Sequence, residues 1–266
     1  MRKSTWLVTA ASVFGVLVTR TAFSQVAVAT YQFNNTLSAQ QGGVPALVAT
    51  DPLGLNGFGT DTVFGNSRTV YSFNGNNVPT NEQAGLTLDT TGLVSNTVYS
   101  AELVFKFTER DGAWRRIIDV EDRQSDNGFY VDPSNNLDIF PVAGSSAAFT
   151  TNAYHHVVLT DSGGVAKAYL DGSLQLTAIP TVMDINNAGD LMHLFLDNVV
   201  GGGQGEFSDG SIALFKLYNQ ELNAAQIRVL ADDPFGTAAV PEPGTYALLA
   251  GMFVPGAALL IRRRKV

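Results

Sequence analysis

The side chains most able to do chemistry in this sequence are carboxylates and amides in polar loops beside predicted strands. Their oxygens are the ligands that Ca²⁺ prefers, and about six to eight of them surround each ion. No contiguous loop has the spacing of an EF-hand, so these ligands would have to converge from separate loops. Aspartate and asparagine also favour turns for their own reasons, so an ordinary turn role stays open. The candidate ligands for Ca²⁺, the one cofactor indicated, are Asp126, Asn127, Asp197, Asn198 and Asp209.

The three histidines of the chain offer little for metal binding or catalysis. His155 and His156 are adjacent, so on a strand their side chains point to opposite faces and cannot chelate one ion together. Only His193 remains as a third. We therefore expect a packed or hydrogen-bonded structural role for the adjacent pair.

Four aromatic residues on predicted strands could form a platform for sugar rings. Aromatic residues on alternating strands more often belong to the core, so both roles stay open. The four are Tyr130, Phe140, Tyr154 and Tyr169.

Charge and cysteine content argue against several functions. All 24 acidic residues lie between Asp51 and Glu242, whereas seven of the 16 lysines and arginines lie in the two terminal segments. The central part is therefore strongly acidic, which argues against nucleic acid as a partner. The absence of cysteine removes disulfides, thiol catalysis and thiolate metal sites, while an apolar content of 45% supplies material for a core.

Residues 1–24 have the parts of a secretion signal. A charged start at Arg2 and Lys3 precedes an apolar run that is shorter than the ~20 residues a membrane span requires. Small residues follow, which places the signal-peptidase cut before Gln25, with a second choice before Thr30.

The C-terminus carries a second signal with three parts. A Pro-Glu-Pro triplet, Pro241, Glu242 and Pro243, is followed by an apolar stretch at 246–261 and then by a basic end. Because basic residues beside an apolar segment stay on the cytoplasmic side, the domain before this segment would face outward. The membrane-orienting residues are Arg262, Arg263, Arg264 and Lys265.

The order and spacing of these parts resemble the PEP-CTERM sorting signal, which here corresponds to residues 238–266. The resemblance implies that the tail holds the exported protein transiently in the inner membrane until an exosortase-like processing enzyme cuts near the triplet. It also implies a Gram-negative bacterial host that makes an extracellular polysaccharide matrix. The mature protein would then lie at the cell surface or in that matrix.

Residues 25–237 are predicted to form one domain of short strands separated by turn residues. The dipeptide Asp171-Gly172 accepts the positive φ angles of a tight hairpin. Residues 34–66 are rich in glycine, asparagine and threonine, which predicts a long loop or an irregular edge. The main strands are expected at 98–107, 154–160, 165–170, 191–196 and 211–218.

One short helix is expected after the last strand, from Asn223 to Ala231. Asn223 can cap this helix, Gln226 stands where a capping box needs an amide, and Leu222 and Ile227 have the spacing of a hydrophobic staple. Many strands, one short helix and no βαβ alternation predict an all-β fold, a two-sheet antiparallel jelly-roll sandwich.

Three stretches, 154–160, 168–172 and 210–219, resemble the laminin-G-like, concanavalin A-like jelly roll. Tyr154 stands where that family usually has tryptophan before two histidines. The resemblance covers most of residues 68–231 and implies the fold. It leaves the ligand open, because the fold hosts lectins, adhesion modules, enzymes and spacers alike.

Glucan-cleaving members of the concanavalin-type fold place Glu, Asp and Glu at nearly alternate positions of one strand, so that two carboxylates flank the bond to be cut. Here Asp119 and Glu121 alternate, but Ile117 stands where the first carboxylate should be, and Arg123 stands third if Asp119 is counted first. The incomplete triad makes a solvated strand edge the simpler interpretation.

The sequence therefore predicts an exported, non-enzymatic protein of the cell surface or matrix. Its domain would bind an extracellular polysaccharide or a surface protein, or would act as a structural spacer. A glycan hydrolase on the same fold is the alternative.

Overall fold

The computed structural model of the protein describes residues 26–75, 82–179, 182–185, 187–200, 205–207 and 209–236. The predicted signal peptide at 1–24 and the sorting segment at 238–266, with its apolar stretch at 246–261, lie outside these residues. The same holds for Pro241–Pro243 and Arg262–Lys265. Within the described ranges, no helix is both long enough and apolar enough to cross a membrane.

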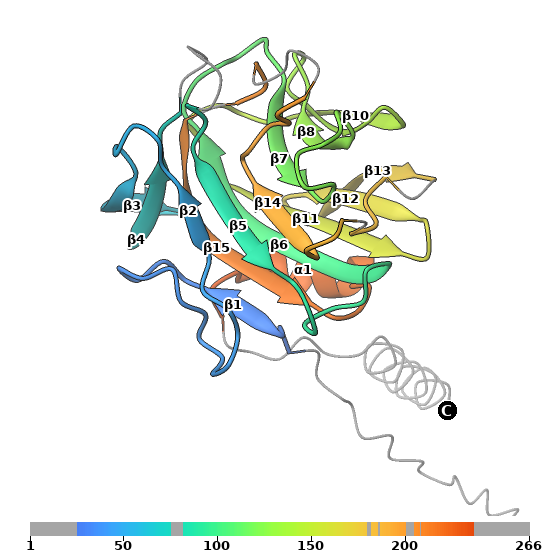
Figure 1. Ribbon diagram of the computed structural model, residues 1–266, viewed down its shortest axis with the longest axis horizontal. Coiled ribbons are helices and arrows are strands. Elements are labelled where there is room, and N and C mark those ends of the chain that lie inside the picture. The colour runs from blue at the N-terminus through green and yellow to red at the C-terminus, as the bar shows by residue number, and fades with distance from the viewer. Residues whose placement is uncertain are drawn as a thin grey trace, which may run out of the picture.

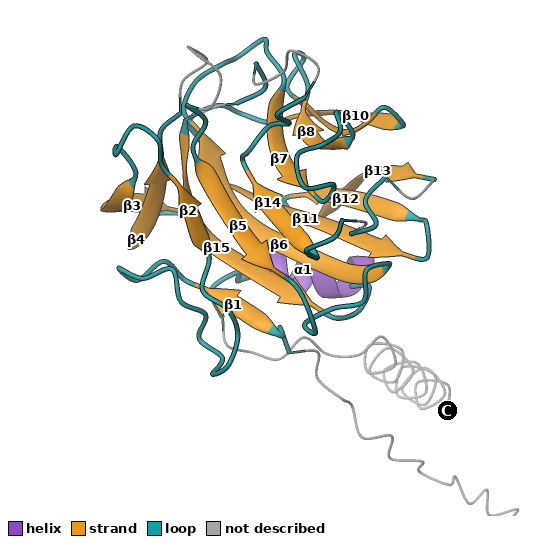
Figure 2. Ribbon diagram, in the orientation of Figure 1, coloured by secondary structure: helices purple, strands orange, loops and turns teal. Residues whose placement is uncertain are grey.

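Two antiparallel sheets pack face to face in the described part of the chain and form a sandwich, as predicted (Figures 1 and 2). The eight-stranded sheet has the order β13 (Ser173–Ala178), β12 (Ala166–Leu170), β11 (His155–Ser162), β6 (Val98–Phe107), β15 (Gly210–Tyr218), β4 (Asn66–Phe73) and β3 (Gly57–Val63), and β1 (Ala29–Tyr31) pairs with β15. The seven-stranded sheet has the order β10 (Ala143–Ala148), β9 (Asn136–Phe140), β8 (Gly128–Val131), β7 (Arg115–Asp119), β14 (Leu191–Leu194), β5 (Gly85–Asp89) and β2 (Val48–Thr50).

The alternation predicted for 98–107 appears in β6. Tyr99, Leu103 and Phe107 point into the core between the sheets. Glu102 points to the opposite face and is buried there as well. Both faces of this strand are therefore covered, one by the other sheet and one by the helix and the segment that follows it.

Phenylalanine rings join the two sheets. Phe195, directly after β14, stacks on Phe73 of β4 with ring centroids 4.1 Å apart and an interplanar angle of 8°. The same ring lies 5.2 Å from Phe105 and 5.8 Å from Phe107, both on β6. Because such pairs add to the stabilisation that apolar burial provides, they hold the end of β14 against the eight-stranded sheet.

Two hairpins use two-residue turns with positive φ at both central positions. Asp171 and Gly172 join β12 to β13 at φ values of 48° and 79°, which confirms the predicted turn. Phe64 and Gly65 join β3 to β4 in the same way, at 48° and 78°. Phenylalanine is unusual at such a position, because a side chain there crowds the backbone.

Residues 34–66, expected as a loop or irregular edge, contain two strands. β2 and β3 are the outermost strands of the two sheets, so the expectation of an edge holds and that of one continuous loop is wrong. β2 pairs with β5, far along the chain, and β3 pairs with β4 across a tight turn. Composition alone does not reveal either pairing.

The helix α1 (Ala224–Asp232) starts as predicted. Asn223 accepts hydrogen bonds from the backbone N–H groups of Ala225 and Gln226, and the Gln226 side chain accepts from the Asn223 N–H at 2.8 Å. Leu222 and Ile227 both belong to the cluster that packs α1 on the outer face of the eight-stranded sheet.

Replacing Asn223 with alanine should lower the free energy of unfolding by about 1 kcal/mol, because two N–H groups lose their acceptor. Thermal unfolding of Asn223→Ala beside Arg228→Ala, a change at an exposed position of the same helix, measures this. Equal stability of the two variants would contradict a capping role for Asn223.

Candidate functional site

The outer face of the seven-stranded sheet carries polar and aromatic side chains. On β8, Phe129 and Val131 belong to the core, so alternation turns Tyr130 outward. Tyr130 lies opposite Arg116 of β7 and Asp138 of β9 in the strand pairing. A row of groups able to form hydrogen bonds therefore crosses three neighbouring strands.

Arg116 is the centre of this face, and its side chain is 0% exposed. The guanidinium pairs with Asp119, donates to the Ser125 carbonyl at 3.3 Å and donates to the Tyr130 hydroxyl. Its Nε lies 3.5 Å from Oδ1 of Asp197. A buried guanidinium is costly unless anions and acceptors surround it, so these partners must stay in place for the fold to tolerate Arg116.

Asp119 is buried, which corrects the expectation of a solvated strand edge. Its Oδ1 accepts the backbone N–H groups of Glu121 at 3.1 Å and Arg123 at 2.9 Å, while Oδ2 pairs with Arg116. Burial raises the pKa of Asp119, although the charge of Arg116 and the two N–H groups act to lower it. Glu121 lies beyond the end of β7, where its carboxylate accepts from the Asn127 side chain at 3.4 Å.

Three carboxylates from two loops, one between β7 and β8 and one between β14 and β15, converge beside Arg116. Asp126, Asp197 and Glu206 each place one oxygen within 4.8 Å of the other two. The Asn198 side chain donates to Asp126 at 2.8 Å and to Asp197 at 3.3 Å. Asp126, Asp197 and Asn198 are among the calcium candidates named from the sequence, whereas Glu206 is not.

Glu206 is the unusual member of this cluster. Burial, followed by the charge of Asp197 and a hydrogen bond with it, raises the pKa of Glu206 to about 8. Its Oε2 is buried without a hydrogen-bond partner in the described residues. The Glu206 carboxyl therefore keeps its proton at neutral pH, and the cluster then carries less negative charge than three carboxylates would.

The cluster has the donor type that a hard divalent cation requires. Asp126, Asp197 and Glu206 would hold Ca²⁺ through carboxylate oxygens, and the ion would displace the proton of Glu206. Arg116 lies 3.9 Å from Asp126 and 3.8 Å from Glu206 and competes for the same oxygens. Binding of a cation here would therefore be coupled to pH and to the position of this guanidinium.

An aromatic group adjoins the charged groups. Trp114 lies 5.5 Å from Tyr130 and 5.7 Å from Phe140, with the rings edge to face. Tyr130 is buried, whereas Trp114 and Phe140 are half-buried and keep part of their surface open to solvent. The two open rings can contact the apolar face of a ligand.

The histidines are held by carboxylates. His155 and His156 lie on opposite faces of β11, since His155 packs 4.5 Å from Phe149 in the core while His156 turns toward the side that carries α1. The carboxylate partners are Asp171 for His155 at 2.8 Å, Glu102 for His156 at 3.1 Å and Asp122 for His193 at 3.3 Å.

The remaining predicted residues lie elsewhere. Asp209 accepts the Gly75 N–H at 2.7 Å, away from the calcium candidates. Tyr154 donates to Asp61 at 3.0 Å, and Tyr169 packs under α1, so neither lies with Tyr130 and Phe140.

Sequence reasoning missed Arg116, Glu206 and Trp114. The available signal was the pair Arg115-Arg116 directly before two isoleucines on a predicted strand, because buried arginines require acidic partners.

The sequence matches the model of the concanavalin A-like lectin/glucanases superfamily over residues 80–228. No curated protein matches the sequence. Among solved structures, domain 4 of AbnA, a GH43 extracellular arabinanase from Geobacillus stearothermophilus in complex with arabinotriose, is similar with a TM-score of 0.59 and 18% identity. That match covers 79% of this chain and 100% of the other.

Botulinum neurotoxin chains are also similar. A type C toxin, whose cell entry depends on interaction with two ganglioside molecules, has a TM-score of 0.55 and 14% identity over 80% of this chain and 52% of the toxin chain. The binding domain of neurotoxin DC, in complex with rat synaptotagmin II, has a TM-score of 0.54 and 14% identity. That match covers 79% of this chain and 52% of the toxin chain. This chain spans about half of those toxin chains, and at such identities the likeness concerns the fold.

Glu206→Gln should make stability less sensitive to rising pH. Because the folded protein holds the Glu206 proton up to a pKa of about 8, against 4.5 ordinarily, this group favours folding at low pH and loses that contribution as pH rises through 8. The melting temperature of Glu206→Gln minus that of the wild type should therefore increase between about pH 5 and about pH 9. A difference that stays constant would contradict the raised pKa.

The same pair of proteins tests the cation. Millimolar Ca²⁺ should raise the melting temperature of the wild type more at high pH than at low pH, and should have less effect on Glu206→Gln. An equal response of both proteins would place any Ca²⁺ site elsewhere.

Proposed function

The chain belongs to the concanavalin A-like lectin/glucanases superfamily, and from this premise we propose that it is an exported, non-enzymatic binding module. Its ligand is a carbohydrate of the cell surface or extracellular matrix. The binding surface is the outer face of the seven-stranded sheet, where Trp114 and Phe140 adjoin the cluster of Asp126, Asp197 and Glu206.

The observation that carries this proposal is the position of the two half-buried rings beside fixed polar groups. A sugar ring has an apolar face that packs on an aromatic side chain and hydroxyls that hydrogen-bond to charged groups at its edge. Asp138 lies two positions before Phe140 on β9 and adds a carboxyl group. Burial is the main cause that raises the pKa of this group to about 6. Domain 4 of the arabinanase, of the same fold, is described in complex with arabinotriose.

The contacts of Asp119 support a non-enzymatic role. Both of its carboxylate oxygens are engaged, one by Arg116 and one by backbone N–H groups, so it is not free to attack a substrate. Glu121 stands beyond the end of β7, where its carboxylate accepts from the Asn127 side chain. The pair therefore lacks the arrangement of two opposed carboxyl groups that glycoside hydrolysis requires.

Glycan hydrolysis stays as a second candidate because of Glu206. A carboxyl group with a pKa of about 8 beside the Asp197 carboxylate has the protonation state of a general acid. Its neighbours Arg116 and Asn198 restrain the carboxylates that would have to act with it, which favours binding over turnover.

Export and sorting complete the proposal. Residues 1–24 direct secretion, the tail at 246–261 holds the precursor in the inner membrane, and Arg262–Lys265 keep its end cytoplasmic. An exosortase-like enzyme then acts near Pro241–Pro243, and the mature domain reaches the surface or matrix. A surface protein instead of a polysaccharide is the other partner that this location allows.

Removing the aromatic rings should weaken carbohydrate binding. In a glycan array with and without Ca²⁺, followed by titration of the best ligand, Trp114→Ala and Phe140→Ala should each reduce affinity by about tenfold. Phe58→Ala, at a partly exposed ring on β3 of the other sheet, is the matched control and should bind normally.

Two outcomes would contradict this proposal. Unchanged binding in both ring variants would exclude the outer face of the seven-stranded sheet as the site. Turnover of a polysaccharide that Glu206→Gln abolishes would replace the binding module with a hydrolase.

Processing should depend on the C-terminal triplet. Intact-mass measurement of the exported protein should find a species without residues 1–24 and without Val266, because both terminal signals are removed. A Pro241→Ala, Glu242→Ala, Pro243→Ala variant should accumulate in the membrane fraction with its tail attached. Full-length wild-type protein in the cytoplasm would refute export.

A further inference from the structure

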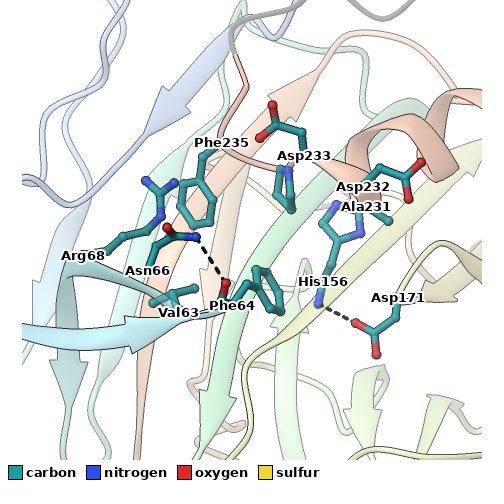
Figure 3. A pocket seen from close by; sticks show the side chains of 11 residues that line it. Val63, Phe64, Asn66, Arg68, His156, Asp171, Ala231, Asp232, Asp233 and Phe235 are labelled. Carbon is teal, nitrogen blue, oxygen red and sulfur yellow. Dashed lines mark hydrogen bonds between the residues drawn. The ribbon is translucent and has the colours of Figure 1, made fainter.

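A cavity lies on the opposite side of the sandwich from the candidate site, on the outer face of the eight-stranded sheet (Figure 3). Its volume is about 390 Å³, within the size range of small-molecule sites. The walls come from the β3–β4 hairpin, the start of β11, the β12–β13 turn and the end of α1 with the residues after it. Among its lining side chains are Phe64, Arg68, His156, Asp171, Asp232 and Phe235.

His156 lines this cavity with an unused hydrogen-bonding atom. The residue is 1% exposed, and its Nδ1 has no hydrogen-bond partner within the described part of the chain. Its Nε2 lies 3.1 Å from Glu102, and Figure 3 shows its ring turned toward the end of α1. A buried nitrogen without a partner costs free energy, which a hydrogen bond to a ligand would recover.

The state of Glu102 decides what His156 offers. Burial alone raises the pKa of Glu102, but the hydrogen bond from His156 and the charge of Lys216 outweigh it and lower the pKa. Tyr218 also donates to Glu102, at 2.6 Å. Glu102 is therefore ionised and engages Nε2 of His156, which leaves Nδ1 as the unpartnered ring nitrogen. The cavity thus presents a buried polar atom to a hydroxyl group, which can donate or accept a hydrogen bond.

Phe64 stands at the mouth of the cavity in a strained conformation. Its φ is 48°, in the left-handed region that a bulky side chain rarely adopts, and it is 46% exposed. The equivalent turn between β12 and β13 uses aspartate and glycine, which tolerate this geometry. An exposed ring at a position that costs backbone energy indicates that the ring serves a contact outside the fold.

The charges of the cavity select against anions. Asp171, Asp232 and Asp233 contribute three carboxylates, and Arg68 contributes one guanidinium, which lies over the Phe235 ring at 3.5 Å. A ligand rich in hydroxyl donors and without negative charge suits this set.

We propose that this cavity is a second saccharide site, which takes a short neutral or amino sugar with its ring on Phe64 and a hydroxyl hydrogen-bonded to His156 Nδ1. It rests on the proposed function only in sharing the ligand class, because no residue is common to the two sites. A module with a site on each side of the sandwich can bridge two polysaccharide chains.

The test follows the imidazole nitrogens of the full-length chain by ¹⁵N NMR, in a detergent without a sugar headgroup. The probes are cellobiose, a glucosamine disaccharide and a glucuronic acid disaccharide. The first two should shift the Nδ1 signal of His156, with His155 and His193 as internal references. The glucuronic acid disaccharide should leave it unchanged.

Phe64→Asn separates binding from folding. Asparagine tolerates positive φ, so the variant should melt about 2–4 °C higher for each kcal/mol of strain removed, while binding at His156 weakens by about tenfold. Asp232→Asn, at an exposed position, should weaken binding of the glucosamine disaccharide more than binding of cellobiose.

The proposed function can fail independently of this inference. A response of His156 that persists in Trp114→Ala and disappears in Phe64→Asn supports the second site. Three results would each overturn the second site. The first is binding that Trp114→Ala abolishes and Phe64→Asn leaves intact. The others are no response of His156 to any probe and preferential binding of the glucuronic acid disaccharide.

Discussion

The burial of the Arg116 guanidinium is the constraint on which the outer face of the seven-stranded sheet depends. A cation removed from water requires anions and acceptors around it, and Arg116 obtains them from Asp119 on its own strand and from loops that follow β7 and β14. These loops are thereby fixed over the end of the sheet, and Asp126, Asp197 and Glu206 are brought within reach of one another. The raised pKa of Glu206 is a consequence of the same crowding.

The outer face of the eight-stranded sheet also contains a buried charged group with partners around it. Glu102 is fully buried on β6 and is satisfied by His156, Tyr218 and Lys216. Lys216 in turn donates to the carbonyl of Pro234 at 2.6 Å, which ties the segment after α1 to the sheet. Each outer face therefore has a buried charged group that positions the loops or the helix above it, while the aromatic core lies between the two sheets.

Part of the candidate site could be predicted from the sequence. Asp126, Asp197 and Asn198 were candidate ligands because each stands in a polar loop beside a strand, and the structure joins them. Asp209 also stands in a polar loop beside a strand, but its carboxylate accepts from Gly75 and it is not part of the cluster. Glu206 was not named from the sequence and belongs to the cluster. Loop composition indicates that a residue can be a ligand, whereas the path of the loop decides which ligands meet.

The sequence by itself determined the features whose partners are close in the chain. The alternation of 98–107, the Asp171-Gly172 turn and the capping box of Asn223 and Gln226 follow from local sterics and hydrogen bonding. Only the tertiary structure decided the burial of Asp119 and the presence of a cavity beside Phe64. Asp119 is buried by an arginine on the same strand that distant loops cover, and the cavity is closed by residues about 90 to 170 positions from Phe64. Contacts across such separations depend on strand order and register, which no local pattern encodes.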